Sequence, residues 1–205
     1  GARGAFFPTR LENAYAAFRQ SPEDEKVLSL LLGFRPIGDY GSSQDPAQLA
    51  REFALTPTAA TLVLPLACAT GRCLLEADKV GETEPTVLSW DDGPPWTLRL
   101  TLTPTADAEV LSLTGALFRE EETLDPKETL PLAGVGLFIK DACLHSLRHA
   151  AEARWISMLG ETPLSVPRKD MGDFLTTFFQ SAHIPELVLP DEWAFERKTL
   201  DPRPH

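Results

Sequence analysis

The chain has 205 residues, of which 43% are hydrophobic, so it is long enough to bury the core of one generous domain or of two small ones. Thirty acidic residues against nineteen basic ones give a net charge of −11, and a field of that sign repels phosphate backbones. Composition therefore disfavours nucleic-acid binding by this chain alone. The sequence has no run of 18 apolar residues, so we expect no membrane span, and its three cysteines fit a reducing cytoplasm better than a disulfide framework.

Helix signals dominate the first 60 residues. Thr9 and Glu12 have capping-box spacing, and Ser21 followed by Pro22 is typical of the start of a second helix, which Gly33 ends. A third helix is expected from about Asp45 to Leu55. These patterns predict a helical N-terminal section over residues 1–60.

From about Thr61 the hydrophobic period changes toward two, which is typical of strands. The connections "DGPP" and "TADA" are short enough to join antiparallel neighbours, so we expect a meander, while "REEETLDPKE" is expected to be a charged loop. The stretch "DACLHSL" is strand-like as well. The other expected strands are Cys73–Ala77, Thr86–Trp90, Trp96–Thr103, Glu109–Phe118 and Val135–Lys140.

The last third is mixed. It contains a short helix over 149–160, a short strand in "PLSVP", a helix over 168–180, and the extended segment "IPELVLPDEW". The apolar residues of the second helix, which share one face, are Met171, Phe174, Leu175, Phe178 and Phe179. We therefore predict an α+β fold in which N-terminal helices pack on an antiparallel β-meander with additional C-terminal helices, the α+β domain spanning 61–193.

The corner "WDDGPPW" is the most unusual local feature. It comprises Trp90, Asp91, Asp92, Gly93, Pro94, Pro95 and Trp96. Paired carboxylates between aromatic walls can share a proton or hold a hard cation. The same residues also suit a rigid turn, in which an aspartate bonds its own backbone, glycine takes a positive φ and proline fixes φ. The turn is the favoured interpretation, and it places Leu98, Leu100 and Leu102 on the core face of the following strand.

Two further groups of residues are candidates for binding a metal ion, an anion or a partner. Cys68, Cys73, Cys143, His145 and His149 form a conceivable zinc set, but their spacing matches no strong pattern. Arg72 in the turn "ATGRC" is a candidate anion or partner contact, although such an arginine more often pairs with a neighbouring carboxylate. The sequence has no phosphate loop, G-x-S-x-G elbow or H-E-x-x-H motif, so we assign no catalytic, cofactor-binding or metal-binding residue.

Several segments together resemble a specific family. They are "LPLACATGRCLL", "LSWDDGPPWTLRL", "LTGALFR", "LPLAGVGLFI", "ARWISML", "LSVPRKDMGDFLTTFF" and "IPELVLPDEW". From about Leu62 to Trp193 the chain resembles the N-terminal, non-catalytic region of bacterial Swi/Snf-type helicase-like ATPases. The "WDDGPPW" corner is the most specific of these motifs, whereas residues 1–60 match only as generic helices.

The resemblance implies an accessory or regulatory domain, itself without enzyme activity or cofactor, placed before the ATP-driven motor of a larger nucleic-acid translocase. Residues 194–205 would then be a linker toward that motor. The implied partners are the motor and a protein, with nucleic acid bound through the motor and no membrane. Two alternatives stay open: a stand-alone metal-dependent hydrolase that uses Asp91 and Asp92, and a purely structural spacer.

Overall fold

The computed structural model describes residues 21–32, 55–75, 85–107, 109–161, 164–181 and 184–193. These residues form an α+β fold with four α-helices and with strands in three sheets, which confirms the α+β class but not the predicted meander. The helices expected from Thr9 and from Asp45 lie outside the described residues, apart from Leu55. None of the helices in the described ranges combines the length and the apolar character needed to cross a membrane.

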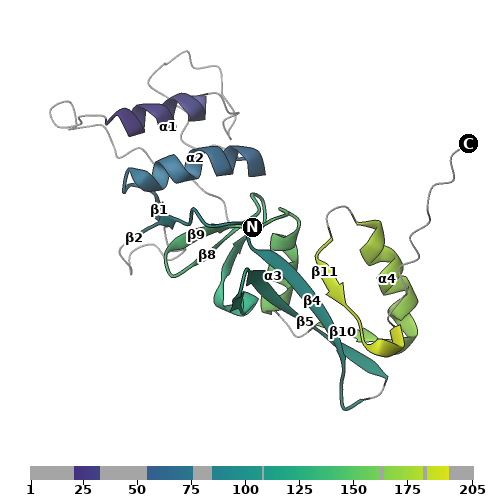
Figure 1. The fold of residues 1–205 in the computed structure, drawn as a ribbon. Coiled ribbons are helices and arrows are strands. Elements are labelled where there is room, and N and C mark those ends of the chain that lie inside the picture. Colours follow the sequence, from purple (N-terminus) through teal and green to yellow (C-terminus); the bar gives the residue numbers. More distant parts are fainter. Residues whose placement is uncertain are drawn as a thin grey trace, which may run out of the picture.

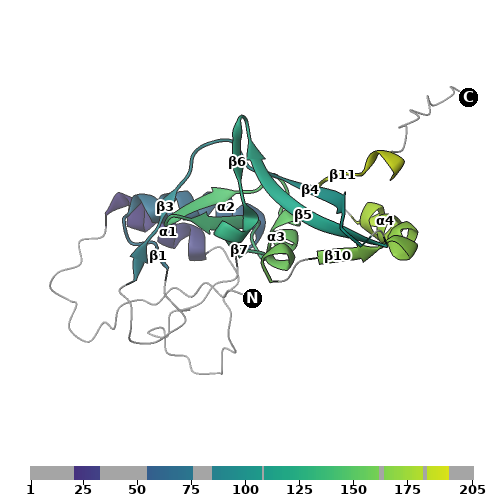
Figure 2. The same cartoon turned by 90° about the horizontal axis from the view of Figure 1, so that it is seen from below.

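Two helices form a layer at one end of the molecule (Figures 1 and 2). Helix α1 (Pro22–Leu32) starts as predicted, because the amide of Asp24 donates to Oγ of Ser21 and the amide of Ser21 donates back to the Asp24 carboxylate. Helix α2 (Pro57–Ala69) is capped by Thr56 and has Pro57 at its first position. The strand-like period expected from Thr61 is therefore wrong over 61–69, and α2 runs through the boundary proposed at residue 60.

The larger sheet is built on a long hairpin. Strands β4 (Thr97–Pro104) and β5 (Val110–Arg119) pair antiparallel through the predicted "TADA" connection. Strand β10 (Leu164–Pro167) joins β5, and β11 (Glu186–Val188) joins β4 in parallel. The expected loop "REEETLDPKE" instead contains β6 (Glu122–Leu124), which pairs with β5, and the 3-10 turn η2 (Pro126–Glu128). The sheet is thus mixed and not a simple meander.

The smaller sheet lies beside the first. Its order is β3 (Ser89–Trp90), β9 (Cys143–Ser146), β8 (Leu137–Lys140) and β7 (Leu130–Leu132), with β3 parallel to β9. A separate pair is formed by β1 (Leu74–Leu75) and β2 (Thr86–Val87). The prediction that the "DGPP" corner joins antiparallel neighbours is therefore wrong. The corner carries the chain from the smaller sheet into the larger one.

The C-terminal half adds two helices. Helix α3 (Glu152–Glu161) packs on β4, β5 and β7, while η3 (Arg168–Asp170) leads into α4 (Met171–Gln180) at the end of the molecule opposite α1 and α2 (Figures 1 and 2). The last described element is the turn η4 (Asp191–Trp193). On α4 the predicted buried face is correct for Met171, Leu175 and Phe178, but Phe179 is 54% exposed because it is rotated about 100° from Phe178.

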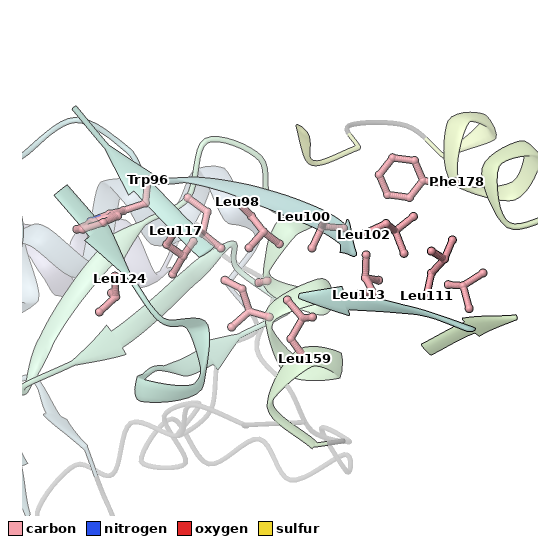
Figure 3. Close-up of a cluster of buried hydrophobic side chains, with 14 of the residues drawn as sticks. Trp96, Leu98, Leu100, Leu102, Leu111, Leu113, Leu117, Leu124, Leu159 and Phe178 are labelled. Atoms are coloured by element: carbon pink, nitrogen blue, oxygen red, sulfur yellow. The ribbon is translucent and has the colours of Figure 1, made fainter. Parts of the chain in front are cut away.

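One core fills the space between the larger sheet and helices α3 and α4 (Figure 3). Leu98, Leu100 and Leu102 are 0%, 0% and 2% exposed, which confirms the predicted face of β4. Burial of one such leucine contributes about 2 kcal/mol. A Cβ on Gly115 of β5 would lie 2.4 Å from Cδ1 of Leu159, so the glycine lets α3 approach the sheet closely.

A second core lies between α1, α2 and the smaller sheet. Strand β8 belongs to both cores, because its side chains alternate between the two faces of the sheet. Leu137 and Ile139 pack toward α2, whereas Phe138 packs into the first core. All three are buried, which explains why β8 shows no alternation of apolar and polar residues.

Candidate functional site

The "WDDGPPW" corner is a turn, as predicted from its residues. Oδ1 of Asp91 accepts a hydrogen bond of 3.0 Å from the amide of Gly93, which is the expected bond from an aspartate to its own backbone. The positive φ expected for Gly93 is wrong, because positive φ among the described glycines occurs at Gly71 and Gly136. A Cβ on Gly93 would instead lie 2.7 Å from Nη1 of Arg119, so the glycine is needed for space.

Asp91 is the centre of a charge cluster formed by Asp91, Arg119 and His145. Its Oδ2 accepts hydrogen bonds from Nη1 of Arg119 and from Nδ1 of His145, the latter at 2.6 Å. Nη2 of Arg119 donates to Glu122 at 2.9 Å. Partial burial acts to raise the pKa of Asp91, but the hydrogen bonds from His145, Gly93 and Arg119 outweigh it and lower that pKa below its usual value. The carboxylate is therefore ionised and fully partnered.

Aromatic rings surround the charge cluster. The guanidinium of Arg119 lies 4.5 Å from the ring centre of Trp96, at cation–π distance. The ring of His145 stacks on Phe138 with centroids 5.0 Å apart and meets Trp96 edge-on. Trp96 itself is 5% exposed, so the second tryptophan of the corner is a core residue. The cluster thus joins the corner, the end of β5 and strand β9.

Sequence reasoning placed Asp91 in a turn but missed the pairing of Arg119 and His145 with it. Arg119 lies 28 positions and His145 lies 54 positions after Asp91, so no local pattern links them. Asp91 belongs to "WDDGPPW" and Arg119 to "LTGALFR", two of the motifs on which the family resemblance depends. These two motifs meet in the folded chain.

A shallow pocket of about 410 Å³ opens beside the cluster, between β6 and the β8–β9 hairpin. Trp96 and Leu124 contribute apolar surface, and Figure 3 shows these two side chains at the same end of the first core. Cys143 and His145 also line the pocket, so they point to one side of β9, as alternation predicts. Glu122 and Asp141 contribute carboxylates.

The structure does not bring the other candidate site residues together into a binding or catalytic site. Asp92 is exposed and is not among the partners of the charge cluster. Within the described ranges, no three His, Cys, Asp or Glu side chains are grouped so as to hold a metal ion. Cys68 and Cys73 do lie together: a thiol–thiol hydrogen bond, followed by burial, raises the pKa of Cys68, and the same bond lowers that of Cys73. All three cysteines are free thiols.

Arg72 is used within the fold. Its Nη1 donates to Oδ2 of Asp24 at 2.8 Å, which ties the turn after α2 to the first turn of α1. A backbone hydrogen bond from Ser21, supported by Ser21 Oγ and by Arg72, lowers the pKa of Asp24. This ion pair is the outcome that an acidic chain favours for such an arginine.

Glu152 is a second unusual carboxylate, and no sequence pattern points to it. It opens helix α3, is 0% exposed, and accepts no hydrogen bond at either oxygen from the described residues. Burial raises the pKa of Glu152 to about 7, although the amides of Leu98 and His149 and the charge of Arg148 oppose the shift. Those amides are near enough to oppose the shift without reaching hydrogen-bond geometry.

Comparison with protein-family models, with curated proteins and with solved structures finds no match. The geometry of the site therefore carries the functional argument.

Proposed function

We propose that this chain is a non-catalytic accessory domain of a larger ATP-dependent, helicase-like nucleic-acid motor, where it regulates the motor or docks a protein. The observation that carries the proposal is the contact between Asp91 and Arg119. It joins the two motifs "WDDGPPW" and "LTGALFR", on which the resemblance to the Swi/Snf-type ATPases partly depends. The most distinctive residues of the chain thus connect its two sheets, which supports a structural part for this corner within an accessory domain.

The geometry supports this role over a metal-dependent hydrolase. A carboxylate that holds a divalent cation must offer its oxygens to the metal. Both oxygens of Asp91 already accept hydrogen bonds, and the guanidinium of Arg119 would repel a metal ion at the same place. Asp92, the second acid of the proposed pair, is exposed to solvent.

The charge of the chain supports the choice of partners. A domain with a net charge of −11 can compete with nucleic acid for the cationic cleft of a motor, or attract a basic protein, while contacting nucleic acid only through the motor. We assign the chain to the cytoplasm, in keeping with its three free thiols. We also expect no association with a membrane.

A deletion experiment tests the proposal. The natural gene product, including whatever residues its gene encodes after His205, is compared with the same protein lacking residues 1–205. We expect the deletion to change the nucleic-acid-stimulated ATPase rate or the nucleic-acid affinity, with an effect that shrinks at higher salt because screening weakens the acidic field. Identical rates and affinities at several salt concentrations would favour the spacer, and a gene product without any ATPase motor would remove the proposal.

A further inference from the structure

The pocket between β6 and the β8–β9 hairpin combines an apolar floor with hydrogen-bond acceptors. Trp96 and Leu124 are both buried in the first core and both line the pocket. The charged and ring side chains that also line it are Glu122, Lys140, Asp141 and His145. A ligand that fits must therefore bring donors together with a flat or aliphatic surface.

His145 lines the pocket and binds Asp91 through Nδ1. The ionised carboxylate of Asp91 can only accept, so Nδ1 of His145 carries the hydrogen in the 2.6 Å bond between them. No described residue hydrogen-bonds to the other ring nitrogen, Nε2. The bond to Asp91 thereby fixes the orientation of the His145 ring beside the pocket.

The fold neutralises only part of the negative charge of the two carboxylates that line the pocket, Glu122 and Asp141. Asp141 is exposed at the tip of the β8–β9 hairpin and forms no ion pair with a described residue, while the neighbouring Lys140 binds Glu128 at 2.6 Å. Oε2 of Glu122 accepts a hydrogen bond from Arg119, whereas Oε1 accepts none from a described residue. Among the Asp, Glu, Lys and Arg residues that line the pocket, two are carboxylates, Glu122 and Asp141, and one is a cation, Lys140.

We propose that this pocket binds an arginine side chain from a basic segment of a protein partner. A guanidinium is planar, carries five N–H donors and packs against aromatic rings, which matches acceptors around an apolar floor better than an ammonium does. The volume of about 410 Å³ leaves room for the side chain and parts of its neighbours. This inference rests on the proposed interaction role, and it adds the chemistry of the partner and the place where it binds.

The test uses the full 205-residue chain and three synthetic peptides of equal length. Each peptide has three identical residues separated by glycines: arginine, lysine or citrulline, which is a neutral analogue of arginine. Binding is followed by ¹H–¹⁵N NMR at increasing peptide concentration. We expect shifts centred on Thr123, Asp141 and His145, with the arginine peptide binding more tightly than the lysine peptide and the citrulline peptide most weakly. Added salt should weaken binding.

Two variants make the test specific. Asp141→Asn removes one charge and keeps the turn, because asparagine tolerates the φ of 49° at this position; it should lower the affinity about fivefold, equivalent to about 1 kcal/mol. Glu109→Gln, on an exposed residue of the β4–β5 hairpin, is the matched control and should leave the affinity unchanged. Equal affinities for Asp141→Asn and Glu109→Gln, or equal binding of the arginine and citrulline peptides, would overturn the proposal.

The remaining outcomes are also decisive. Absence of shifts at the pocket with every peptide would overturn the arginine site, yet it would leave the deletion test of the accessory role unaffected, so the two failures are distinguishable. Shifts of the same residues on addition of a single-stranded oligonucleotide would show a nucleic-acid surface and would also overturn the proposal.

Discussion

Asp91 and Glu152 are two carboxylates in neighbouring parts of the fold, and their surroundings are opposite. Asp91 is partly exposed and accepts hydrogen bonds from Arg119, His145 and its own turn, so its pKa is lowered. Glu152 is fully buried with no hydrogen bond to its oxygens from the described residues, so its pKa is raised to about 7. Burial destabilises the charged form in both cases, and the difference is made by the partners.

The two carboxylates make the stability of the domain depend on pH in opposite directions. A lowered pKa means that ionisation of Asp91 stabilises the folded state. This stabilisation is lost as pH falls through the pKa of the folded state. A raised pKa means that the folded state favours protonated Glu152, so stability is lost as pH rises from about 4.5 toward 7. The same residue chemistry thus gives opposite pH dependences in one fold.

Trp96→Ala should have the largest effect. The ring fills the first core and carries the guanidinium of Arg119 on its face. Its removal leaves a cavity and loosens the charge cluster, and we expect the free energy of unfolding to fall by about 3 to 5 kcal/mol. Urea unfolding monitored by circular dichroism measures it. An unchanged unfolding midpoint would contradict the core role of this tryptophan.

Glu152→Gln should stabilise the protein at high pH. The wild-type carboxylate must ionise inside the core above pH 7, and a shift from 4.5 to about 7 corresponds to about 3 kcal/mol, which the neutral glutamine avoids. We expect the advantage of the variant to be greatest at pH 8 and to disappear near pH 4.5. Unfolding free energies measured across this range give the answer, with the exposed Glu121→Gln as the control. A pH-independent difference would be evidence against a raised pKa.

Asp91→Asn should destabilise the protein by about 2 kcal/mol at neutral pH, because Arg119 and His145 lose the charge that partners them. The loss should shrink as pH falls below the ordinary value of 3.8 and through the lowered pKa of Asp91 in the folded state. Asp92→Asn, one residue along the same corner but exposed, is the control and should change stability by less than about 0.5 kcal/mol. Equal effects of the two substitutions would mean that the charge cluster adds nothing.

Gly93→Ala should have the smallest cost, about 1 kcal/mol. The new methyl group would displace Nη1 of Arg119, which lies at the end of a flexible side chain and can move partly away. Gly172→Ala in α4 is the comparison, since a Cβ there meets no atom within 4 Å and should stabilise the helix by about 0.5 kcal/mol. Thermal unfolding of both variants is sufficient, and a stabilised Gly93→Ala would show that the close approach is not required.

Local patterns predicted the elements whose signals are local. The N-terminal cap of α1 and the alternation of β4 were readable because each depends on residues a few positions apart. Helix α2 was missed because its 13 residues include no charged side chain, so its apolar and polar faces do not contrast. Strand β6 was not predicted because it lies in an acidic stretch. Its strand structure depends on pairing with β5.

The candidate site was predictable only in part. The corner indicated a turn from its own residues, and Asp91 does bond its own backbone there. The role of Arg119 and His145 depends on which strands lie next to each other, and β3 pairs with β9 in parallel over a gap of 54 positions. Glu152 looked like an ordinary acid in the first turn of a helix, where the sequence favours exposure, and only packing against the sheet buries it.

Strand β8 has one consequence for how the molecule comes apart. Phe138 holds one core while Leu137 and Ile139 hold the other, so the α1–α2 layer cannot leave without baring the back of a strand that the opposite core requires. The two cores should consequently melt as a single all-or-none unit, and damage on either side of this shared wall should be felt on the other.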